Sequence, residues 1–379
     1  MGEECPFPNY IQLGYSAAMD RTLMFGVFLP LANGGWIISE NTPRIDGTYP
    51  LNRQAAILAD DLGFDFILSM MKWRGYGGIT DHWGTSLESM TMMAALAEAT
   101  KRTKVWCTAH TLLHHPVVIA KMMATLDHIS NGRAGLNVVS GAYRGEFEQM
   151  GMWRADLDHD RRYDLAREWI EILLRLWSEK SVDYKGEFFN LTDCISDPKP
   201  LSKPRPDLIC AGMSDVGLDF TARYTDGGFV AGQTEEEIAV VSKRAKDFGA
   251  KYGKKIQTYA MYTIVPGATD KEAEARVAHF VAGTDHVAVE GMRASYGLKP
   301  DGRETSLVAR SRRNGFMTSY LAGSAETIRQ KIVSTIQTAE LDGMMLIFPD
   351  YVEDLKFFGE SILPNVRRSL GVAAAVAAD

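Results

Sequence analysis

Eight short apolar runs alternate with segments of helical periodicity along this chain, and this alternation constrains its fold more than any other feature. Short apolar runs bounded by turn residues are typical of strands that are buried on both faces of a sheet. Alternation of such strands with amphipathic helices predicts a parallel sheet. The predicted strands span residues 23–30, 64–70, 104–110, 133–141, 207–212, 227–232, 256–265 and 343–350.

Helical segments separate these strands. Residues 51–63 end at Gly63, a residue suited to the left-handed position after a helix. Pro116 stands at a first helical position, and Ser86 begins half of a capping box, because Ser89 occupies the place of the usual Glu or Gln. Eight strand–helix units favour closure into a (β/α)8 TIM barrel, with a doubly wound open sheet as the alternative. The main predicted helices span residues 51–63, 86–100, 116–130, 161–177, 235–252 and 325–339.

The 379 residues are predicted to form one α/β domain with additions at both ends and one inside. Residues 1–22 form an N-terminal extension, residues 23–370 the barrel, and residues 371–379 a tail. Residues 279–314 are rich in charged and turn residues and match no barrel element. Long segments of this kind are usually functional lids or disordered loops, and the sequence leaves both open.

Charge and cysteine content restrict the partners and the compartment. The chain carries 48 acidic and 41 basic residues, a net charge of −7, and no basic block, so nucleic acid and anionic membranes are not expected partners. It has no apolar run long enough to span a membrane, and its acidic N-terminus lacks the apolar core of a signal peptide. Its four cysteines are far apart. We therefore expect a cytoplasmic protein without disulfides.

Small and polar residues follow several predicted strands, where barrel enzymes place their reactive groups. The segment AGMSDVG, residues 211–217, joins a strand to a helix, so that Ser214 either holds a phosphate at a helix N-terminus or simply caps the helix. Arg162 and Tyr163 add donors at another helix start, unless they belong to a solvated turn. The segment NVVSGAYRGEFEQMG, residues 137–151, runs from the end of the fourth predicted strand into the connection after it and carries Asn137 and Glu146.

Several other chemistries are not expected. His110, His114 and His115 have few carboxylates nearby in sequence, so we predict no metal site. The chain has no GxSxG elbow, Walker loop or GxGxxG, which argues against hydrolases, P-loop enzymes and Rossmann proteins. We interpret most of six paired methionines as core residues: Met70, Met71, Met92, Met93, Met122 and Met123.

Six segments together resemble the bacterial-luciferase-like flavin monooxygenases: FGVFLPLANGGWIIS, LGFDFILSMMKWRGYGG, ATLDHISNGRAGLNVVSG, YRGEFEQMG, DRRYD and ICAGMSDVG. The similarity is greatest to the pyrimidine monooxygenase RutA branch, with dimethylsulfone monooxygenase further away. It extends over about residues 25–224 and resumes weakly at 323–364. The resemblance implies a TIM barrel that uses O2 and reduced FMN, delivered by a separate NAD(P)H-dependent flavin reductase. It also implies a homo-oligomer.

The same resemblance implies a site at the C-terminal ends of the strands. Its catalytic residues would be Thr108, Asn137 and Glu146. Thr108 and Asn137 would lie near the edge of the flavin that meets oxygen, whereas Glu146 either binds the cofactor or acts as an acid or base. Arg162, Tyr163 and Ser214 suit the phosphate. The implied cofactor-binding residues are Met71, Lys72, Asn137, Glu146, Arg162, Tyr163 and Ser214. The implied substrate pocket consists of Leu68, Met70, His110, Ala142 and Tyr143.

Two departures from the RutA pattern bear on the substrate. Ala142 stands where that branch carries tryptophan, and His110 stands where it carries alanine. Loss of an indole opens roughly 100 Å³ unless a neighbour such as Tyr143 fills the space. We therefore predict an N-heterocyclic substrate bulkier than uracil. The alternatives are a riboflavin lyase that splits riboflavin into ring and sugar, a deazaflavin-dependent reductase, and a flavin-binding protein without catalysis.

Overall fold

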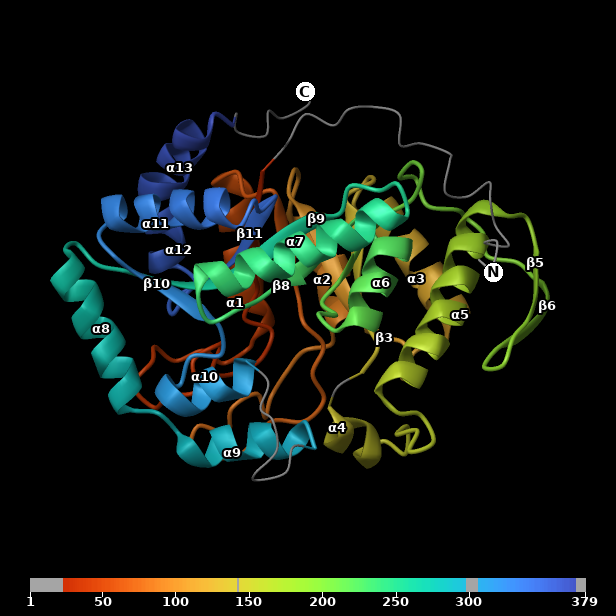
Figure 1. Ribbon diagram of the computed structural model, residues 1–379, viewed down its shortest axis with the longest axis horizontal. Helices are drawn as coiled ribbons and strands as arrows, with labels where there is room; N and C mark the ends of the chain where they lie inside the picture. The colour runs from red at the N-terminus through yellow and green to blue at the C-terminus, as the bar shows by residue number, and fades with distance from the viewer. Residues whose placement is uncertain (1–22, 142, 298–305, 373–379) are drawn as a thin grey trace.

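The computed structural model describes residues 23–141, 143–297 and 306–372, and parallel strands at its centre form a closed barrel surrounded by helices (Figure 1). The barrel strands are β1 (Met24–Phe28), β2 (Phe66–Leu68), β3 (Lys104–His110), β4 (Ala134–Val139), β7 (Asp207–Cys210), β8 (Gly227–Val230), β9 (Gln257–Pro266) and β11 (Gly343–Ile347). Their order is β11-β1-β2-β3-β4-β7-β8, and β9 pairs with both β8 and β11. All eight predicted strands are present, and the fold is the predicted (β/α)8 TIM barrel, not an open sheet.

Helices cover the outside of the barrel between the strands. One predicted start is wrong: α2 begins at Ser89 because the Glu88 side chain, not Ser86, caps it by accepting from the Met90 and Thr91 amides at 2.8 and 2.7 Å. The outer helices are α1 (Tyr49–Asp61), α2 (Ser89–Ala99), α3 (Pro116–Ile129), α5 (His159–Ser178), α6 (Asp215–Tyr224), α7 (Glu235–Lys251), α11 (Ala325–Thr338), α12 (Glu353–Phe357), the π-helix Phe358–Ile362 and α13 (Leu363–Leu370).

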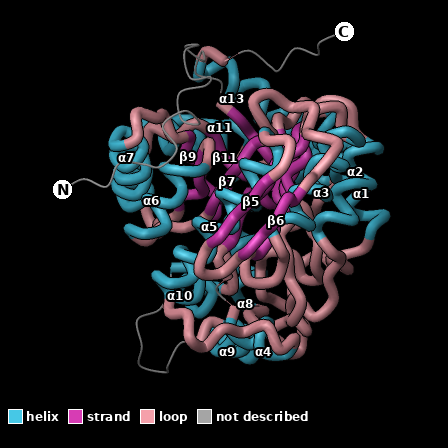
Figure 2. Tube along the Cα trace, turned by 90° about the vertical axis from the view of Figure 1, so that its right-hand side faces the viewer, coloured by secondary structure: helices cyan, strands magenta, loops and turns pink. Residues whose placement is uncertain are grey.

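Further elements are added to the eight units. A hairpin of β5 (Val182–Lys185) and β6 (Asn190–Cys194) follows α5 (Figure 2). β10 (Ser319–Gly323) extends the sheet beside β9. The short α4 (Arg144–Gln149) follows β4.

Helices also occupy the region between β9 and β10. They are α8 (Asp270–Ala282), α9 (His286–Ser295) and α10 (Ser306–Asn314), so the described part of the predicted 279–314 insert is mainly helical. Residues 1–22, 298–305 and 373–379, together with Ala142, lie outside the described residues. The predicted N-terminal extension and almost all of the predicted tail are among them.

Aromatic side chains fill the barrel interior toward the N-terminal ends of the strands. The rings of Phe66 and Trp106 stack with centroids 4.1 Å apart, and the Tyr259 ring meets both edge-on. Glycines make the room: a Cβ at Gly26 would lie 2.1 Å from the Phe66 ring, and one at Gly135 would lie 2.2 Å from the Trp106 ring. This layer fills the interior near the N-terminal ends of the strands, and barrel enzymes place their sites at the opposite, C-terminal ends.

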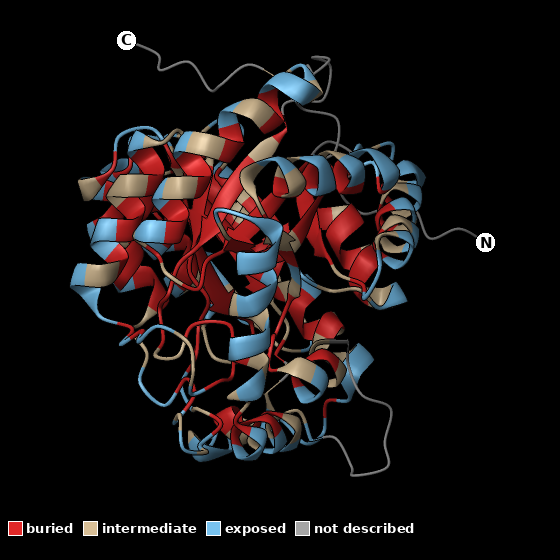
Figure 3. Ribbon diagram, turned by 90° about the vertical axis from the view of Figure 1, so that its left-hand side faces the viewer, coloured by how far each residue is buried: buried red, intermediate tan, exposed pale blue. Residues whose placement is uncertain are grey.

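Burial follows the barrel, with buried residues concentrated on the strands and on the helix faces toward them (Figure 3). Five of the six methionines predicted as core are buried, whereas Met122 is 37% exposed on α3. Cys107 and Cys210 are buried free thiols, as their apolar surroundings suggest. Over the described ranges, no helix combines the length and the apolar character that crossing a bilayer requires.

Gly135 offers a test of the aromatic layer. We expect Gly135→Ala to lower the free energy of unfolding by about 2 kcal/mol or more, because the new methyl group overlaps the Trp106 ring. Gly145→Ala on α4 is the control: a Cβ there would meet no packing partner within 4 Å among the described residues, so alanine should stabilise the helix by about 0.5–1 kcal/mol. Urea unfolding measures both, and a similar effect of the two substitutions would contradict the packing argument.

Candidate active site

Thr108 on β3 and Asn137 on β4 are paired in register and lie side by side at the barrel mouth. The Asn137 Nδ2 donates to Thr108 Oγ1 at 3.2 Å, and Thr108 Oγ1 donates to the Ser69 carbonyl at 2.7 Å. The Thr108 amide donates to Ser89 Oγ at 3.0 Å. The Thr108 hydroxyl is therefore fixed in direction. The buried Asn137 Oδ1 has no hydrogen-bond partner among the described residues, so it is free to accept from a ligand.

Lys72 and Glu146 form an ion pair that is almost completely buried. Lys72 Nζ lies 2.6 Å from Glu146 Oε1, and each side chain is 1% exposed. The same oxygen accepts hydrogen bonds from the Trp73 and Arg74 amides at 3.1 and 3.2 Å. The loop after β2 therefore binds the Glu146 carboxylate on α4. Glu146 Oε2 is buried and has no hydrogen-bond partner in the part of the chain that the structure describes. This second oxygen is a free acceptor inside the site.

Aromatic rings surround the Lys72 ammonium group. Its Nζ lies 3.9 Å from the ring centroid of Tyr143, 4.5 Å from that of Tyr76 and 5.8 Å from that of Trp83. Burial lowers the pKa of Lys72, and the neighbouring Glu146 carboxylate opposes that shift. Attraction between the cation and the ring faces also favours the charged lysine. A charge is thus held in a nearly dry pocket, which is costly unless ion pair and rings act together.

His110, at the end of β3, links these two groups of residues. Its ring lies 5.4 Å from that of Phe147, the neighbour of Glu146, and it interacts with the Met71 backbone and the Lys72 charge. Burial, followed by the nearby His114 and Lys72, lowers the pKa of His110 to about 3, so the imidazole is neutral at physiological pH. Leu68, Met70 and Met71 are buried at the end of β2. Of the predicted substrate pocket, Ala142 lies outside the described residues.

Of the three residues predicted to bind the phosphate, only Ser214 and Tyr163 lie together. Ser214 caps α6 by accepting from the Gly217 amide at 3.2 Å, and its hydroxyl and that of Ser140 face the Tyr163 hydroxyl. A Cβ at Gly212 would lie 2.4 Å from this hydroxyl, so Tyr163 rests against the turn itself. The Arg162 guanidinium instead lies over Trp153, with ring and cation 5.4 Å apart, and donates to the Leu157 carbonyl. Tyr163, rather than Arg162, contacts the start of α6.

The chemistry of these residues would suit a phosphorylated flavin. Ser214 and the unpaired amides at the start of α6 suit a phosphate. The buried Arg162 Nε has no partner within the described ranges and remains available as a donor. The free oxygens of Asn137 and Glu146 suit a polar ring edge. The individual roles of these residues remain predictions.

Sequence reasoning missed several residues of the site. Ser69 and Ser89 fix Thr108, and Tyr76 and Tyr296 surround the Lys72 pocket. Ser69 lies at the end of the predicted strand 64–70 and directly follows the observed β2, so its position near a strand end was a usable signal. Tyr296 is far away in sequence within an insert of unknown placement, so no local pattern pointed to it.

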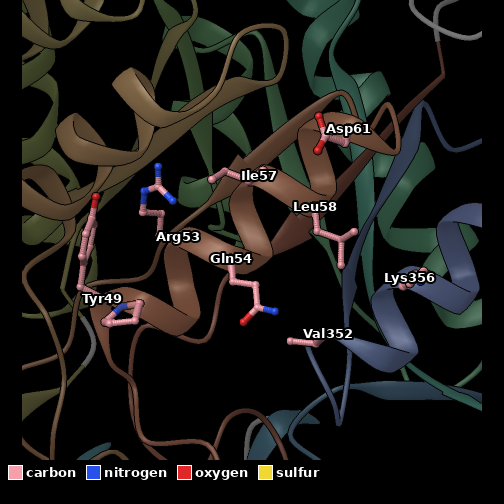
Figure 4. Close-up of a pocket in the computed structure, with 9 residues that line it drawn as sticks. Tyr49, Arg53, Gln54, Ile57, Leu58, Asp61, Val352 and Lys356 are labelled. Carbon is pink, nitrogen blue, oxygen red and sulfur yellow. The ribbon is translucent and has the colours of Figure 1, made fainter.

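A surface groove of about 500 Å³ lies elsewhere, between α1 and α12 on the outside of the barrel (Figure 4). It is lined by residues such as Tyr49, Arg53 and Lys356, and by none of the predicted site residues. Among the described residues, no group of three His, Cys, Asp or Glu side chains is arranged to hold a metal ion.

Comparison with known proteins adds to this geometry. A family model described as luciferase-like monooxygenase matches residues 23–341. The pyrimidine monooxygenase RutA of Methylorubrum extorquens strain PA1 is 37% identical over 358 residues, which cover 92% of this chain and 95% of that protein. The pyrimidine monooxygenase RutA of Variovorax paradoxus strain S110 is 35% identical over 359 residues, covering 93% and 96%.

Solved structures share the fold at lower sequence identity. A riboflavin lyase, crystallised with modified FMN and its substrate riboflavin, superposes with a TM-score of 0.84 at 22% identity over 94% of each chain. A long-chain alkane monooxygenase superposes with a TM-score of 0.81 at 19% identity over 95% of this chain and 94% of its own. At these identities the likeness establishes the fold, not the substrate.

The mutual dependence of the Lys72 and Glu146 charges can be tested by measuring the stability of variants of the protein. We expect Lys72→Met to lower the free energy of unfolding by about 3–5 kcal/mol, because a buried carboxylate loses its counter-ion. The double variant Lys72→Met/Glu146→Gln should recover most of that loss, since both charges are gone.

The exposed pair Lys243–Asp247 is the control for this experiment. Its charged atoms lie 2.7 Å apart, close to the 2.6 Å of the buried pair, but the side chains are 75% and 58% exposed, so Lys243→Met should change stability by less than about 1 kcal/mol. Urea unfolding measures all variants. Additive losses in the double variant would show that the buried charges do not depend on each other.

Proposed function

Because the chain belongs to the luciferase-like monooxygenase family, we propose that it uses O2 and reduced FMN to oxidise or cleave an N-heterocyclic compound bulkier than uracil. Membership confirms the predicted enzyme class, an FMN-dependent two-component monooxygenase, and the predicted cofactor, reduced FMN with O2 as co-substrate. The substrate and the supplying NAD(P)H-dependent flavin reductase belong to the proposal. So do the expected homo-oligomer and the cytoplasmic location.

The observation that carries the proposal is a set of buried polar atoms without hydrogen-bond partners among the described residues. Asn137 Oδ1, Glu146 Oε2 and Arg162 Nε belong to this set. An unpaired buried polar atom costs about 1–3 kcal/mol, so each of these atoms favours a bound group that completes it. A flavin offers ring N–H groups to the two oxygens and a phosphate to the guanidinium. An apolar ligand would leave the same atoms without hydrogen-bond partners.

The protein residues have three tasks in this proposal. Ser214, Tyr163 and the α6 N-terminus hold the phosphate, which fixes the cofactor along the barrel mouth. Asn137 orients the ring edge beside the fixed Thr108 hydroxyl, and Glu146 accepts a proton or hydrogen bond through its free oxygen. Reduced FMN, when bound, supplies the electrons that activate O2. The nearly dry surroundings of Lys72 and Glu146 limit the access of water.

Three observations support an N-heterocyclic substrate. Relatives that are 35–37% identical are named pyrimidine monooxygenases. Neutral His110, whose Nδ1 has no hydrogen-bond partner among the described residues, can hydrogen-bond with a ring nitrogen or carbonyl of such a compound. The sequence departure at Ala142, where the RutA branch carries tryptophan, supports a substrate larger than uracil. Cleavage of riboflavin is the bulkiest form of this proposal, and the same departure favours it.

A turnover assay tests the substrate class. The protein, FMN, a flavin reductase and NADH are incubated in air with uracil, a fused bicyclic N-heterocycle or riboflavin, and the products are identified by mass spectrometry. We expect a bulky heterocycle to be consumed faster than uracil. With labelled oxygen, one atom should enter the product and the other should be reduced to water with the electrons of NADH.

The outcomes of this assay separate the alternatives. Loss of riboflavin without turnover of the other compounds would identify the lyase. Faster turnover of uracil than of every larger compound would contradict the enlarged substrate. Binding of a deazaflavin but not of FMN would point to the reductase alternative. FMN binding with no consumption of any substrate would contradict the proposal and favour a flavin-binding protein without catalysis.

Ser214 tests the phosphate site separately. We expect Ser214→Ala to weaken FMN binding about tenfold and to leave riboflavin binding within about twofold, because only FMN carries the phosphate. Ser324→Ala removes a matching cap from α11, where Ser324 accepts from the Thr327 amide, and should not affect flavin binding. Flavin fluorescence titration measures both. Equal weakening of FMN and riboflavin would place the phosphate elsewhere.

A further inference from the structure

Helix α9 packs against the loops at the barrel mouth, although it belongs to the insert between β9 and β10. Its N-cap residue Asp285 accepts from the Thr80 amide and hydroxyl at 2.8 Å each, which ties the helix to the loop after β2. A Cβ at Gly291 would lie 1.9 Å from the Tyr76 carbonyl oxygen, so helix and loop touch through their backbones. α4 and α9 lie side by side in both views (Figures 1 and 2). The insert is thus part of the wall around the site.

Tyr296, directly after α9, contacts Tyr143 beside the Lys72 pocket. Its hydroxyl donates to the Tyr143 hydroxyl at 3.1 Å, and the two rings lie 4.8 Å apart. The Tyr143 ring in turn lies 3.9 Å from Lys72 Nζ, which is 2.6 Å from Glu146 Oε1. A continuous series of contacts therefore joins the insert to the carboxylate whose second oxygen is free.

Through its hydrogen bond, Tyr296 can control the orientation of the Tyr143 ring. The Tyr143 ring has to keep its face toward the ammonium group, because only the ring face attracts a cation. A hydrogen bond at the hydroxyl restricts rotation of that ring, and Tyr143 itself lies in a loop before α4 without a side-chain cap. Lys72 has Glu146 as its carboxylate partner, so movement of the ring and the lysine would move Glu146 as well.

We propose that Tyr296 is a positioning residue for the flavin site, which holds the Tyr143 ring against Lys72 and so aligns the free oxygen of Glu146 with the cofactor. This inference rests on the proposed function, because it needs FMN to bind beside Glu146. Among the described residues, Tyr296 has its hydrogen bond and its ring contact with Tyr143, not with Lys72 or Glu146. It acts through Tyr143, and it makes the insert a working part of the site.

The test measures coupling, which a purely structural role would not produce. Dissociation constants for oxidised FMN are determined by flavin fluorescence for the full chain, Tyr296→Phe, Glu146→Gln and the double variant. We expect Tyr296→Phe to weaken FMN binding about threefold to tenfold in the native background and less than about 1.5-fold in the Glu146→Gln background. An equal effect in both backgrounds, or no effect in the native one, overturns the inference.

Two further variants keep the test decisive. Tyr143→Phe removes the other end of the same hydrogen bond, so Tyr143→Phe/Tyr296→Phe should bind FMN no more weakly than either single variant. Tyr224→Phe loses a hydroxyl contact to Glu171 on the outer helices and should leave FMN binding unchanged. If the native chain binds FMN without this coupling, only the inference fails. If it does not bind FMN at all, the proposed function fails with it.

Discussion

Hydrogen bonds between β8 and β9 close the parallel sheet into a barrel, and the arrangement of the site depends on this closure. In a closed parallel barrel all strands end in one ring, so residues far apart in the sequence meet at one mouth. Thr108 and Asn137 are 29 positions apart and share a hydrogen bond because β3 and β4 are neighbours in register. The stacked rings of Phe66 and Trp106 fill the opposite end, which leaves the mouth as the place for a ligand.

The buried Lys72–Glu146 pair matters for the site more than for the stability of the fold. Taking two charges out of water costs several kcal/mol each, and an ion pair of this sort is often less stabilising than apolar residues of equal size. Its presence at the mouth therefore agrees better with function than with stability. The loop amides of Trp73 and Arg74 and the rings of Tyr76 and Tyr143 offset part of the cost. They also leave one carboxylate oxygen, Glu146 Oε2, buried and without a partner among the described residues.

Helix α9 belongs to a segment that the barrel itself does not require, and through Tyr296 this segment reaches the Lys72–Glu146 pair. Eight strand–helix units suffice to close the sheet, and α8 to α10 are added between β9 and β10. Through Asp285, Gly291 and Tyr296 the insert packs on the loops that follow β2 and β4. Barrel enzymes diversify through loops and inserts of this kind, while the barrel strands keep their arrangement.

The sequence by itself determined the number and order of the barrel strands, because period and turn residues are local properties. Motif resemblance also located Thr108, Asn137, Lys72, Glu146 and Ser214 near strand ends. Only the tertiary structure decided which of them touch: Thr108 meets Asn137, Lys72 meets Glu146, and Tyr163 rather than Arg162 reaches the start of α6. It also brought in Tyr296, which no pattern indicated. Contacts between loops depend on register, closure and side-chain direction, and these arise only when all elements pack together.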